Sequence, residues 1–132
     1  MSETDARAIE RLKHEYCFTI DSGAYDAWVS LFTDDGRFVR GDVDVYEGTD
    51  ELAAFATEVF DAAFERSAHL VTNPVVEVDG DEATGRWYLL LLAQTEDGVS
   101  FTQARYDDTF RRVDGEWRIA EVAITYGIRH ET

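Results

Sequence analysis

Three Asp-Gly pairs divide the second half of the chain at nearly regular spacing, and they constrain the fold more than any other feature. The pairs are Asp79-Gly80, Asp97-Gly98 and Asp114-Gly115. Such pairs favour tight hairpin turns, because both residues tolerate the left-handed backbone that these turns require. They separate four strand-like segments, which cover about residues 68–78, 82–95, 99–113 and 116–129. The second half therefore predicts a four-stranded antiparallel meander.

The first half of the chain carries helical periodicity instead. Apolar residues at three- and four-residue steps predict a first helix, which Ser2 or Thr4 caps and which ends near residues 21–23. A second helix fits residues 25–32, and a third begins with Thr49 as its cap and carries one apolar stripe. Helices therefore precede the sheet.

The segment between the second and third helices has weaker patterning. Residues 37–40 are typical of a short strand. The polar segment 41–47 is interpreted as a flexible flap over a pocket mouth.

The order of these elements indicates a single α+β domain over residues 1–132, because helix and strand do not alternate. Long strands twist and curl, which gives the sheet a concave face. Helices packed on such a face cannot fill it, so a ligand pocket is expected between the two layers. We predict a cone, in which three N-terminal helices pack on a curved antiparallel sheet around a small-molecule pocket.

The charge is strongly one-sided. The chain has 28 acidic and 12 basic residues, a formal net charge of −16, and Lys13 is its single lysine. Such a field repels nucleic acid and anionic membranes, so neither is expected as a partner. Acidic residues spread along the whole chain, with arginine in place of lysine, further suggest adaptation to a salt-rich cytoplasm, where ions screen the repulsion between the negative charges.

Compartment and metal chemistry follow from what the sequence lacks. No stretch is long and apolar enough to span a membrane, and the acidic first residues do not resemble a signal peptide, so we expect a cytoplasmic protein. Cys17 stands alone, which leaves no cysteine pair for a disulfide or a zinc ion. We expect neither a metal nor an organic cofactor.

Isolated polar residues must carry any chemistry, because phosphate loops, nucleophile elbows and metal-binding helices are absent. Of three histidines, His14 and His130 lie in polar surroundings, whereas His69 lies between Ala68 and Leu70 at the start of the first long strand. A buried histidine bonded only to a backbone carbonyl is the structural alternative for His69.

Other candidates have structural alternatives too. Asp21 ends the first helix and is a candidate cap, and Tyr16 and Trp28 are candidate core aromatics. Asn73 precedes Pro74, which fits a turn or bulge as well as a ligand contact. Strand alternation sends only half of the polar residues inward. The candidates on the strands are Tyr88, Gln94, Gln103, Arg105, Tyr106, Asp107 and Tyr126.

Several short stretches, taken in order, resemble one known family. They are Tyr16-Cys-Phe-Thr-Ile-Asp21, Trp28-Val-Ser-Leu-Phe-Thr-Asp-Asp-Gly36, Tyr46-Glu-Gly48, Arg66-Ser-Ala-His69 with Asn73, Val78-Asp-Gly-Asp-Glu-Ala83 and Val113-Asp-Gly-Glu-Trp117. The sequence is similar to the SnoaL-like branch of the nuclear-transport-factor-two-like superfamily. This resemblance implies a cystatin-like α+β cone. The superfamily includes dehydratases, isomerases, cyclases and noncatalytic subunits.

The dehydratases of this superfamily imply roles for three residues. Asp21 and His69 match an aspartate that supports a catalytic histidine, and Tyr16 matches a tyrosine five residues before that aspartate. The second histidine of scytalone dehydratase has no counterpart on the strand Trp87–Ala93, and neither does the further aspartate of bile-acid dehydratases. Arg129 is a candidate for the arginine that the latter carry near the end of the domain.

The leading hypothesis is a cofactor-independent lyase or isomerase that abstracts a proton next to a carbonyl through Asp21 and His69. The expected ligand is a small apolar, aromatic or polycyclic carbonyl compound, which Tyr88, Tyr106, Asn73, Arg129 and Trp28 contact. The alternative is a noncatalytic ligand-binding or assembly domain. The resemblance also implies a homodimer or homotrimer that associates through the outer sheet face, and the run Leu89–Leu92, apolar on both strand faces, agrees with this. The alternative is that a helix and a loop of the same chain cover the two faces.

Overall fold

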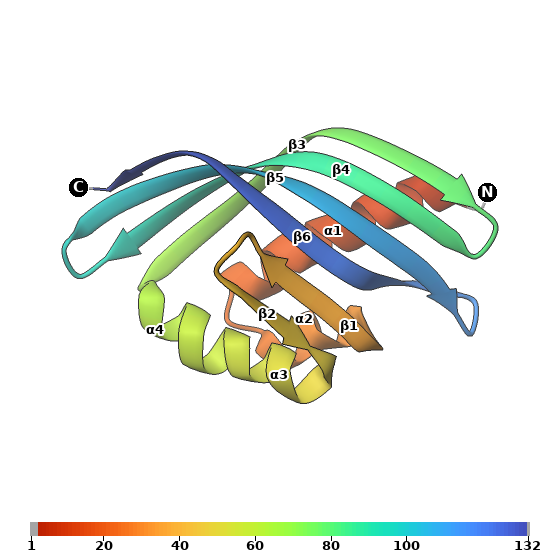
Figure 1. The fold of residues 1–132 in the computed structure, drawn as a ribbon, viewed down its shortest axis with the longest axis horizontal. Helices are drawn as coiled ribbons and strands as arrows, with labels where there is room; N and C mark the ends of the chain where they lie inside the picture. The colour runs from red at the N-terminus through yellow and green to blue at the C-terminus, as the bar shows by residue number, and fades with distance from the viewer. Residues whose placement is uncertain (1–2, 132) are drawn as a thin grey trace.

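A computed structural model describes residues 3–131 and shows helices packed against one long, curved sheet (Figure 1). The elements follow in this order: α1 (Asp5–Asp21), α2 (Tyr25–Ser30), β1 (Phe32–Arg40), β2 (Asp44–Glu47), α3 (Gly48–Ala54), the π-helical segment η1 (Phe55–Phe60), α4 (Asp61–Ala63), β3 (Arg66–Asp79), β4 (Glu82–Thr95), β5 (Gly98–Val113) and β6 (Glu116–Glu131).

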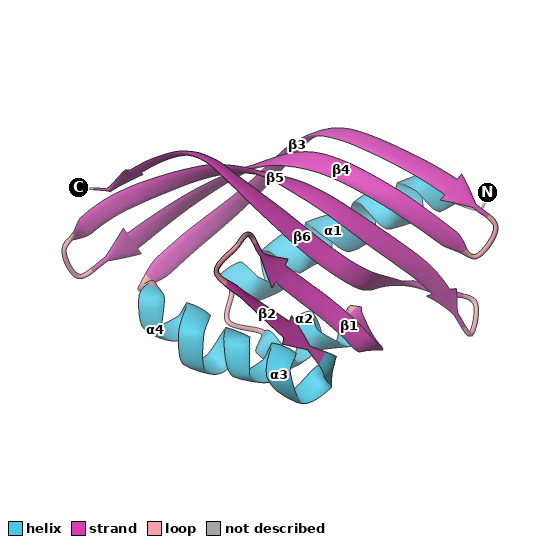
Figure 2. Ribbon diagram, in the orientation of Figure 1, coloured by secondary structure: helices cyan, strands magenta, loops and turns pink. Residues whose placement is uncertain are grey.

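The strands form a sheet in the order β2-β1-β6-β5-β4-β3. All neighbours are antiparallel except β1 and β6, which run parallel. The four long strands arch together, and α1 lies beneath the arch (Figure 2). This arrangement is the cystatin-like α+β cone.

The predicted meander is confirmed, with strand ends within a few residues of those expected. The turns lie where the sequence suggested, but only Asp114-Gly115 fills both turn positions, with φ of 52° and 82°. In the other two hairpins the turn residues are Gly80-Asp81 and Glu96-Asp97, so that Asp79 ends β3 and Gly98 begins β5.

The region from α2 to β2 differs from the prediction. Strand β1 starts earlier than expected, because Phe32 pairs with Ile119 and the Ile119 amide donates to the Leu31 carbonyl at 2.8 Å. The interpretation of residues 41–47 as a flap was wrong in part, since residues 44–47 form β2. Arg40 donates two hydrogen bonds to the Asp44 carboxylate, at 2.9 and 2.6 Å, and these close the β1–β2 hairpin.

The predicted N-terminal cap is confirmed for α1 but not for α3. The Thr4 hydroxyl accepts a hydrogen bond from the Arg7 amide at 3.2 Å, whereas Ser2 lies outside the described residues. The third helix starts at Gly48, with Glu47 as its cap residue, so Thr49 is not the cap. Instead, the Glu51 carboxylate accepts a hydrogen bond from the Glu47 backbone amide at 2.9 Å.

The core fills the space between α1 and the inner face of the sheet. Its largest fully buried side chains include Trp28, Trp87, Tyr106 and Phe110. Lys13 and Asp108 are buried among them. In the described residues, no helix is long and apolar enough to cross a membrane.

Candidate active site

A cavity of about 300 Å³ opens between α1, the β1–β2 hairpin, the π-helical segment and the concave sheet. Its inner wall is aromatic: Tyr16, Trp28, Phe38, Phe55, Phe60 and Tyr106. Its mouth is more polar, with Arg40, Ser100, Thr102, Tyr126 and Arg129. His69 also lines this cavity. The cavity can therefore take an apolar body with a polar end.

Asp21 and His69 meet at the junction of α1 and β3. His69 Nδ1 lies 2.6 Å from Asp21 Oδ1, and the His69 backbone amide donates to Oδ2 at 2.7 Å. The Ser67 hydroxyl donates to Oδ1 at 2.7 Å. The His69 side chain is 6% exposed and that of Asp21 18%. Three hydrogen bonds to one carboxylate therefore fix the histidine against the end of α1.

This contact assigns the protons on the imidazole ring. An ionised carboxylate only accepts hydrogen bonds, so Nδ1 of a neutral His69 must carry the proton. The lone pair then lies on Nε2, for which no partner is found in the described part of the chain. With its orientation fixed by Asp21, His69 has the arrangement of a general base.

The environment of Asp21 keeps its carboxylate ionised. Burial raises the pKa of this carboxyl, but the hydrogen bonds and charge of His69, with the Ser67 hydroxyl, outweigh that effect. The net result is a pKa below the ordinary value of 3.8.

Replacing Asp21 by asparagine tests this pKa shift. A folded-state pKa below 3.8 means that the carboxylate stabilises the fold above pH 3.8, and that this stability is lost as pH falls through the folded pKa. The wild type should therefore lose its advantage over Asp21→Asn, in free energy of unfolding by urea, as pH drops below about 4. Asp26→Asn, an exposed change on α2, is the control. An advantage of Asp21 that stays constant into acid would contradict the shift.

Two tyrosines lie beside the histidine. The Tyr16 ring meets the His69 ring edge-on at 6.5 Å and the Tyr106 ring edge-on at 5.8 Å. Burial raises the pKa of both phenols well above 10, and their hydroxyls share a hydrogen bond. Both therefore stay protonated near neutral pH, and because one phenol proton forms the hydrogen bond between them, one O–H group is left to donate to a ligand oxygen.

The π-helical segment brings phenylalanines to the site. The Phe60 ring lies 5.8 Å from the His69 ring, and Phe55 stacks on Phe38 at 4.7 Å. Segments of this kind occur often at functional sites, because the wider turn shifts side chains relative to an α-helix. Here it places apolar surface next to the imidazole.

The β1–β2 hairpin forms one side of the mouth. Asp44 accepts from Arg40 and, at 2.9 Å, from the Tyr46 hydroxyl, so the hairpin is held in place. On the other side, the Arg129 guanidinium lies 4.5 Å from the centre of the Tyr126 ring. No ion pair of Arg129 is found among the described residues, so its charge is available to a ligand.

Six of the candidate residues line this cavity, and Asp21 supports one of them from behind. The lining residues are Tyr16, Trp28, His69, Tyr106, Tyr126 and Arg129. Tyr88 and Asn73 do not belong to the cavity. Tyr88 is 52% exposed on the outer face, because the side chains alternate along β4 and those of Trp87 and Leu89 point inward. Asn73 has a φ of 59° at a break in the β3–β4 register, which is the structural role considered for it.

The sequence reasoning missed a buried ion pair behind the tyrosines. Lys13 Nζ lies 2.8 Å from Asp108 Oδ2, and both side chains are fully buried. A lysine in an amphipathic helix is normally interpreted as exposed. Its one available signal was its position three residues before Tyr16, on the same helix face.

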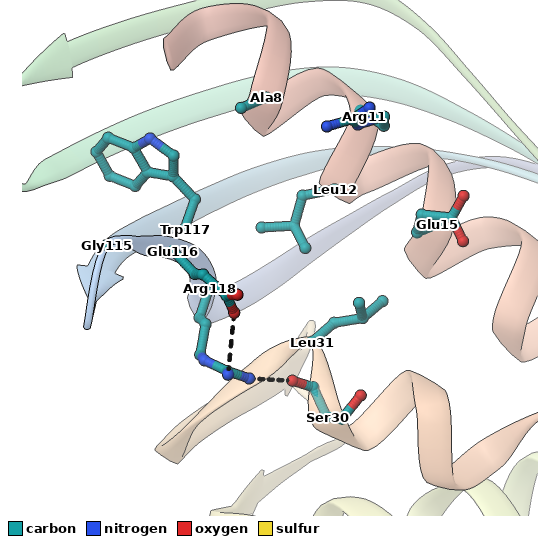
Figure 3. A pocket seen from close by; sticks show the side chains of 10 residues that line it. All are labelled: Ala8, Arg11, Leu12, Glu15, Ser30, Leu31, Gly115, Glu116, Trp117 and Arg118. Atoms are coloured by element: carbon teal, nitrogen blue, oxygen red, sulfur yellow. Dashed lines mark hydrogen bonds and ion pairs between the residues drawn. The ribbon is translucent and has the colours of Figure 1, made fainter. Parts of the chain in front are cut away.

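A second, shallower groove lies on the outside of the molecule, between α1, the end of α2 and the β5–β6 hairpin (Figure 3). Arg118 crosses it, donating to the Ser30 carbonyl at 2.5 Å and contacting Glu116 at 3.4 Å. Arg11 and Glu15 extend from α1 at its edge (Figure 3). No histidine lines this groove, so the cavity at His69 is the candidate site.

The cone defines the class of fold: solved structures similar to this chain are described as having a cystatin-like fold. The sequence model of the SnoaL-like domain matches residues 2–123. This chain belongs to the SnoaL-like family.

Three solved structures illustrate the relationship. A protein of unknown function from Mycobacterium tuberculosis, Rv3472 with the change D26N, is 33% identical over 91% of this chain and 70% of its own, with a TM-score of 0.83. A candidate aromatic-ring hydroxylase from Novosphingobium aromaticivorans is 28% identical over 94% and 90%, with a TM-score of 0.87. A candidate scytalone dehydratase from the same organism is 22% identical over 96% and 86%, also with a TM-score of 0.87. At this last identity, the similarity concerns the fold.

Proposed function

We propose that this protein is a cofactor-independent lyase or isomerase that abstracts a proton next to a carbonyl group of a small ring compound. The observation that carries the proposal is the 2.6 Å contact between Asp21 and His69 at the edge of an open, mostly aromatic cavity. A histidine held by a carboxylate, with its second nitrogen free, is an arrangement suited to general-base catalysis.

The proposed reaction balances without a cofactor. His69 Nε2 takes the proton from the carbon next to the carbonyl, and the electrons of the C–H bond move into an enolate. Tyr16 donates a hydrogen bond to the enolate oxygen, which stabilises the developing charge. In elimination, the enolate re-forms the carbonyl and its electrons make a C=C bond as the C–O bond on the next carbon breaks; the departing hydroxyl group takes the proton from His69 and leaves as water. In isomerisation, the same proton returns to another carbon.

The cavity walls suggest how a ring compound would be held. The aromatic inner wall, including Trp28, would pack against the ring, whereas Arg129 at the mouth would contact a polar or anionic substituent. A ligand that binds only the folded protein raises its melting temperature. A thermal-shift screen of hydroxy-substituted ring ketones is therefore the first experiment, and stabilisation by none of them would argue against this substrate class.

A noncatalytic ligand-binding or assembly domain is the second candidate. It is favoured by the β4 strand, which carries no second histidine or acid facing the cavity. The two proposals differ in one readout. A binding domain would be stabilised by ring ketones but would leave their chemistry unchanged.

We further propose a homodimer or homotrimer formed through the outer sheet face. Leu90 and Leu92 of β4 are exposed there beside Leu70 of β3 and Phe101 of β5, with exposures from 37% to 46%. An apolar cluster of this kind is a typical interaction surface. Light scattering should give a mass above one chain for the wild type and a monomer for Leu90→Glu. Thr84→Glu adds the same charge to the outer face of β4 away from this apolar cluster, and an equal effect of both changes would contradict the assignment of the cluster.

The acidic surface supports a salt-adapted, cytoplasmic protein. A net charge of −16 on 132 residues repels itself, and dissolved ions screen that repulsion. The free energy of unfolding is therefore expected to rise from low to molar potassium chloride. Denaturation curves in urea at each salt concentration measure it, and stability that stays flat or falls would rule out the adaptation.

A further inference from the structure

The single lysine of this chain is buried where a surface charge would be expected. Lys13 is on α1, and its side chain is 0% exposed. Its Nζ lies 2.8 Å from Asp108 Oδ2 on β5, and no other acceptor for it is found in the part of the chain that the structure describes. Every other basic residue except histidine is arginine. The one compact ammonium group thus lies inside the cone.

Aromatic rings surround this ammonium group. Nζ lies 3.4 Å from the centre of the Tyr106 ring, 3.8 Å from that of Tyr16 and 5.8 Å from that of Trp87. Gly85 allows this packing, because a Cβ there would lie 2.4 Å from the Trp87 ring. A desolvated cation over aromatic faces is attracted by the ring quadrupoles. Lys13 is therefore held by the tyrosines as well as by Asp108.

The same two tyrosines form part of the cavity wall. Tyr16 and Tyr106 line the cavity beside His69, whereas Lys13 does not reach it. Lys13 thus lies behind the wall, with the phenol rings between its charge and the ligand space. Tyr16 supplies the donor that the proposed reaction needs, and its hydroxyl is hydrogen-bonded to that of Tyr106.

Stability alone does not account for the ion pair. Removing two charges from water is costly, and a well-packed apolar pair of similar size is often as stable or more stable. Met in place of Lys13 and Leu in place of Asp108 would fill similar volumes. A positive charge against the rings, in contrast, withdraws electron density from the phenols and makes their O–H groups stronger donors.

We propose that Lys13 is a positioning residue, which Asp108 fixes against the rings of Tyr16 and Tyr106 so that these two hydrogen-bonded phenols form an oxyanion-binding pair with one O–H group free for the ligand. The inference rests on the proposed function, because it assigns that pair to the enolate oxygen of the substrate. Lys13 would act through the tyrosines and would not touch the substrate.

The charge states near this pair fit the proposal. Burial lowers the pKa of Lys13, and Asp108 opposes that change. Burial raises the pKa of Asp108 to about 6, against the opposite effect of Lys13, so Asp108 is mainly ionised above that pH. The other titratable groups that face the two tyrosines come from α1, β3 and β6: Cys17, His69 and Tyr126.

A pair of ligands can separate this role from simple packing. Para-nitrophenol offers an ionisable oxygen with a visible phenolate absorbance, and nitrobenzene has nearly the same shape without that oxygen. The variant is Lys13→Met with Asp108→Asn, which removes both charges together and keeps side chains of similar size. Arg11→Met removes a cation from the exposed face of α1 and is the control.

The wild type and Arg11→Met should bind para-nitrophenol with its phenolate form favoured. The double variant should lose about tenfold of that preference, which is one unit in the pKa of the bound phenol, and keep its affinity for nitrobenzene. An unchanged preference in the folded double variant would overturn the proposed role of Lys13 but not the proposed pocket. If the wild type bound neither ligand, both this inference and the proposed pocket would fail.

A second measurement needs no variant. Because the chain has one lysine, isotope-labelled lysine gives a single side-chain amine signal in an NMR spectrum. Para-nitrophenolate should shift this signal, and nitrobenzene should leave it nearly unchanged. A signal that responds to neither ligand, or equally to both, would overturn the proposal even if the double variant did not fold.

Discussion

Alanine in place of His69 is expected to lower turnover by about 10²- to 10⁴-fold, the range typical of general acid–base catalysis. The change removes the one ring nitrogen that lies in the cavity with its lone pair free, while the aromatic wall stays in place. The assay is the rate of elimination or isomerisation of a ring ketone that stabilises the protein in the thermal-shift screen. Binding of that ketone should change much less than its turnover.

Two further variants make the result specific. Asp21→Asn should lose nearly as much activity, because its amide can donate to His69 Nδ1 and thus place the imidazole proton on Nε2. Since the two residues act as a unit, the double variant should be hardly slower than His69→Ala alone. His130→Ala, at the exposed end of β6, is the matched histidine control. Equal activity of His69→Ala and His130→Ala would refute the acid–base role.

The second large effect is expected in stability. Lys13→Met should lower the free energy of unfolding by about 3 kcal/mol near pH 8, because it leaves the buried Asp108 carboxylate without its partner. Arg11→Met, which breaks an exposed ion pair with Glu3, should cost less than about 1 kcal/mol. Urea unfolding measures both. Adding Asp108→Asn to Lys13→Met should recover part of the loss, since no buried charge is then unpaired.

The stability loss of Lys13→Met is also expected to depend on pH. Burial already holds the pKa of Asp108 above its ordinary value of 3.8, and loss of Lys13 raises it further. The folded form of Lys13→Met therefore binds a proton more readily than the unfolded form, and protonation relieves the penalty. The loss of stability should shrink as pH falls from about 8 towards 4. A loss that stayed constant, or grew in acid, would contradict the assignment of the penalty to Asp108.

Local patterns in the sequence were enough to predict most of the fold. The Asp-Gly turns and the apolar periodicity of α1 gave elements whose bounds agree with the structure within a few residues. The parallel pairing of β1 with β6 was not predicted, because it joins segments that are distant in the chain and depends on contacts such as Phe32 with Ile119. The β2 strand was missed because its side chains alternate only weakly in polarity.

The site was less accessible from local patterns. Asp21 and His69 are 48 residues apart, and the resemblance to a family suggested that they meet. Tyr88 was placed inward because its strand has apolar residues on both faces, so that alternation alone did not fix the phase. The Lys13–Asp108 pair was missed for a similar reason, since neither residue reveals burial until α1 packs on β5.

The most direct test of the central claim is the exchange of protons for deuterium next to the carbonyl of a bound ring ketone. In deuterated water, the NMR signal of those protons should disappear with the wild-type protein much faster than with His69→Ala, by about 10²-fold or more. The exchange reports abstraction itself, whether elimination or isomerisation follows. Equal rates with the wild type and His69→Ala, for a ketone that both proteins bind, would contradict the claim that His69 is the base.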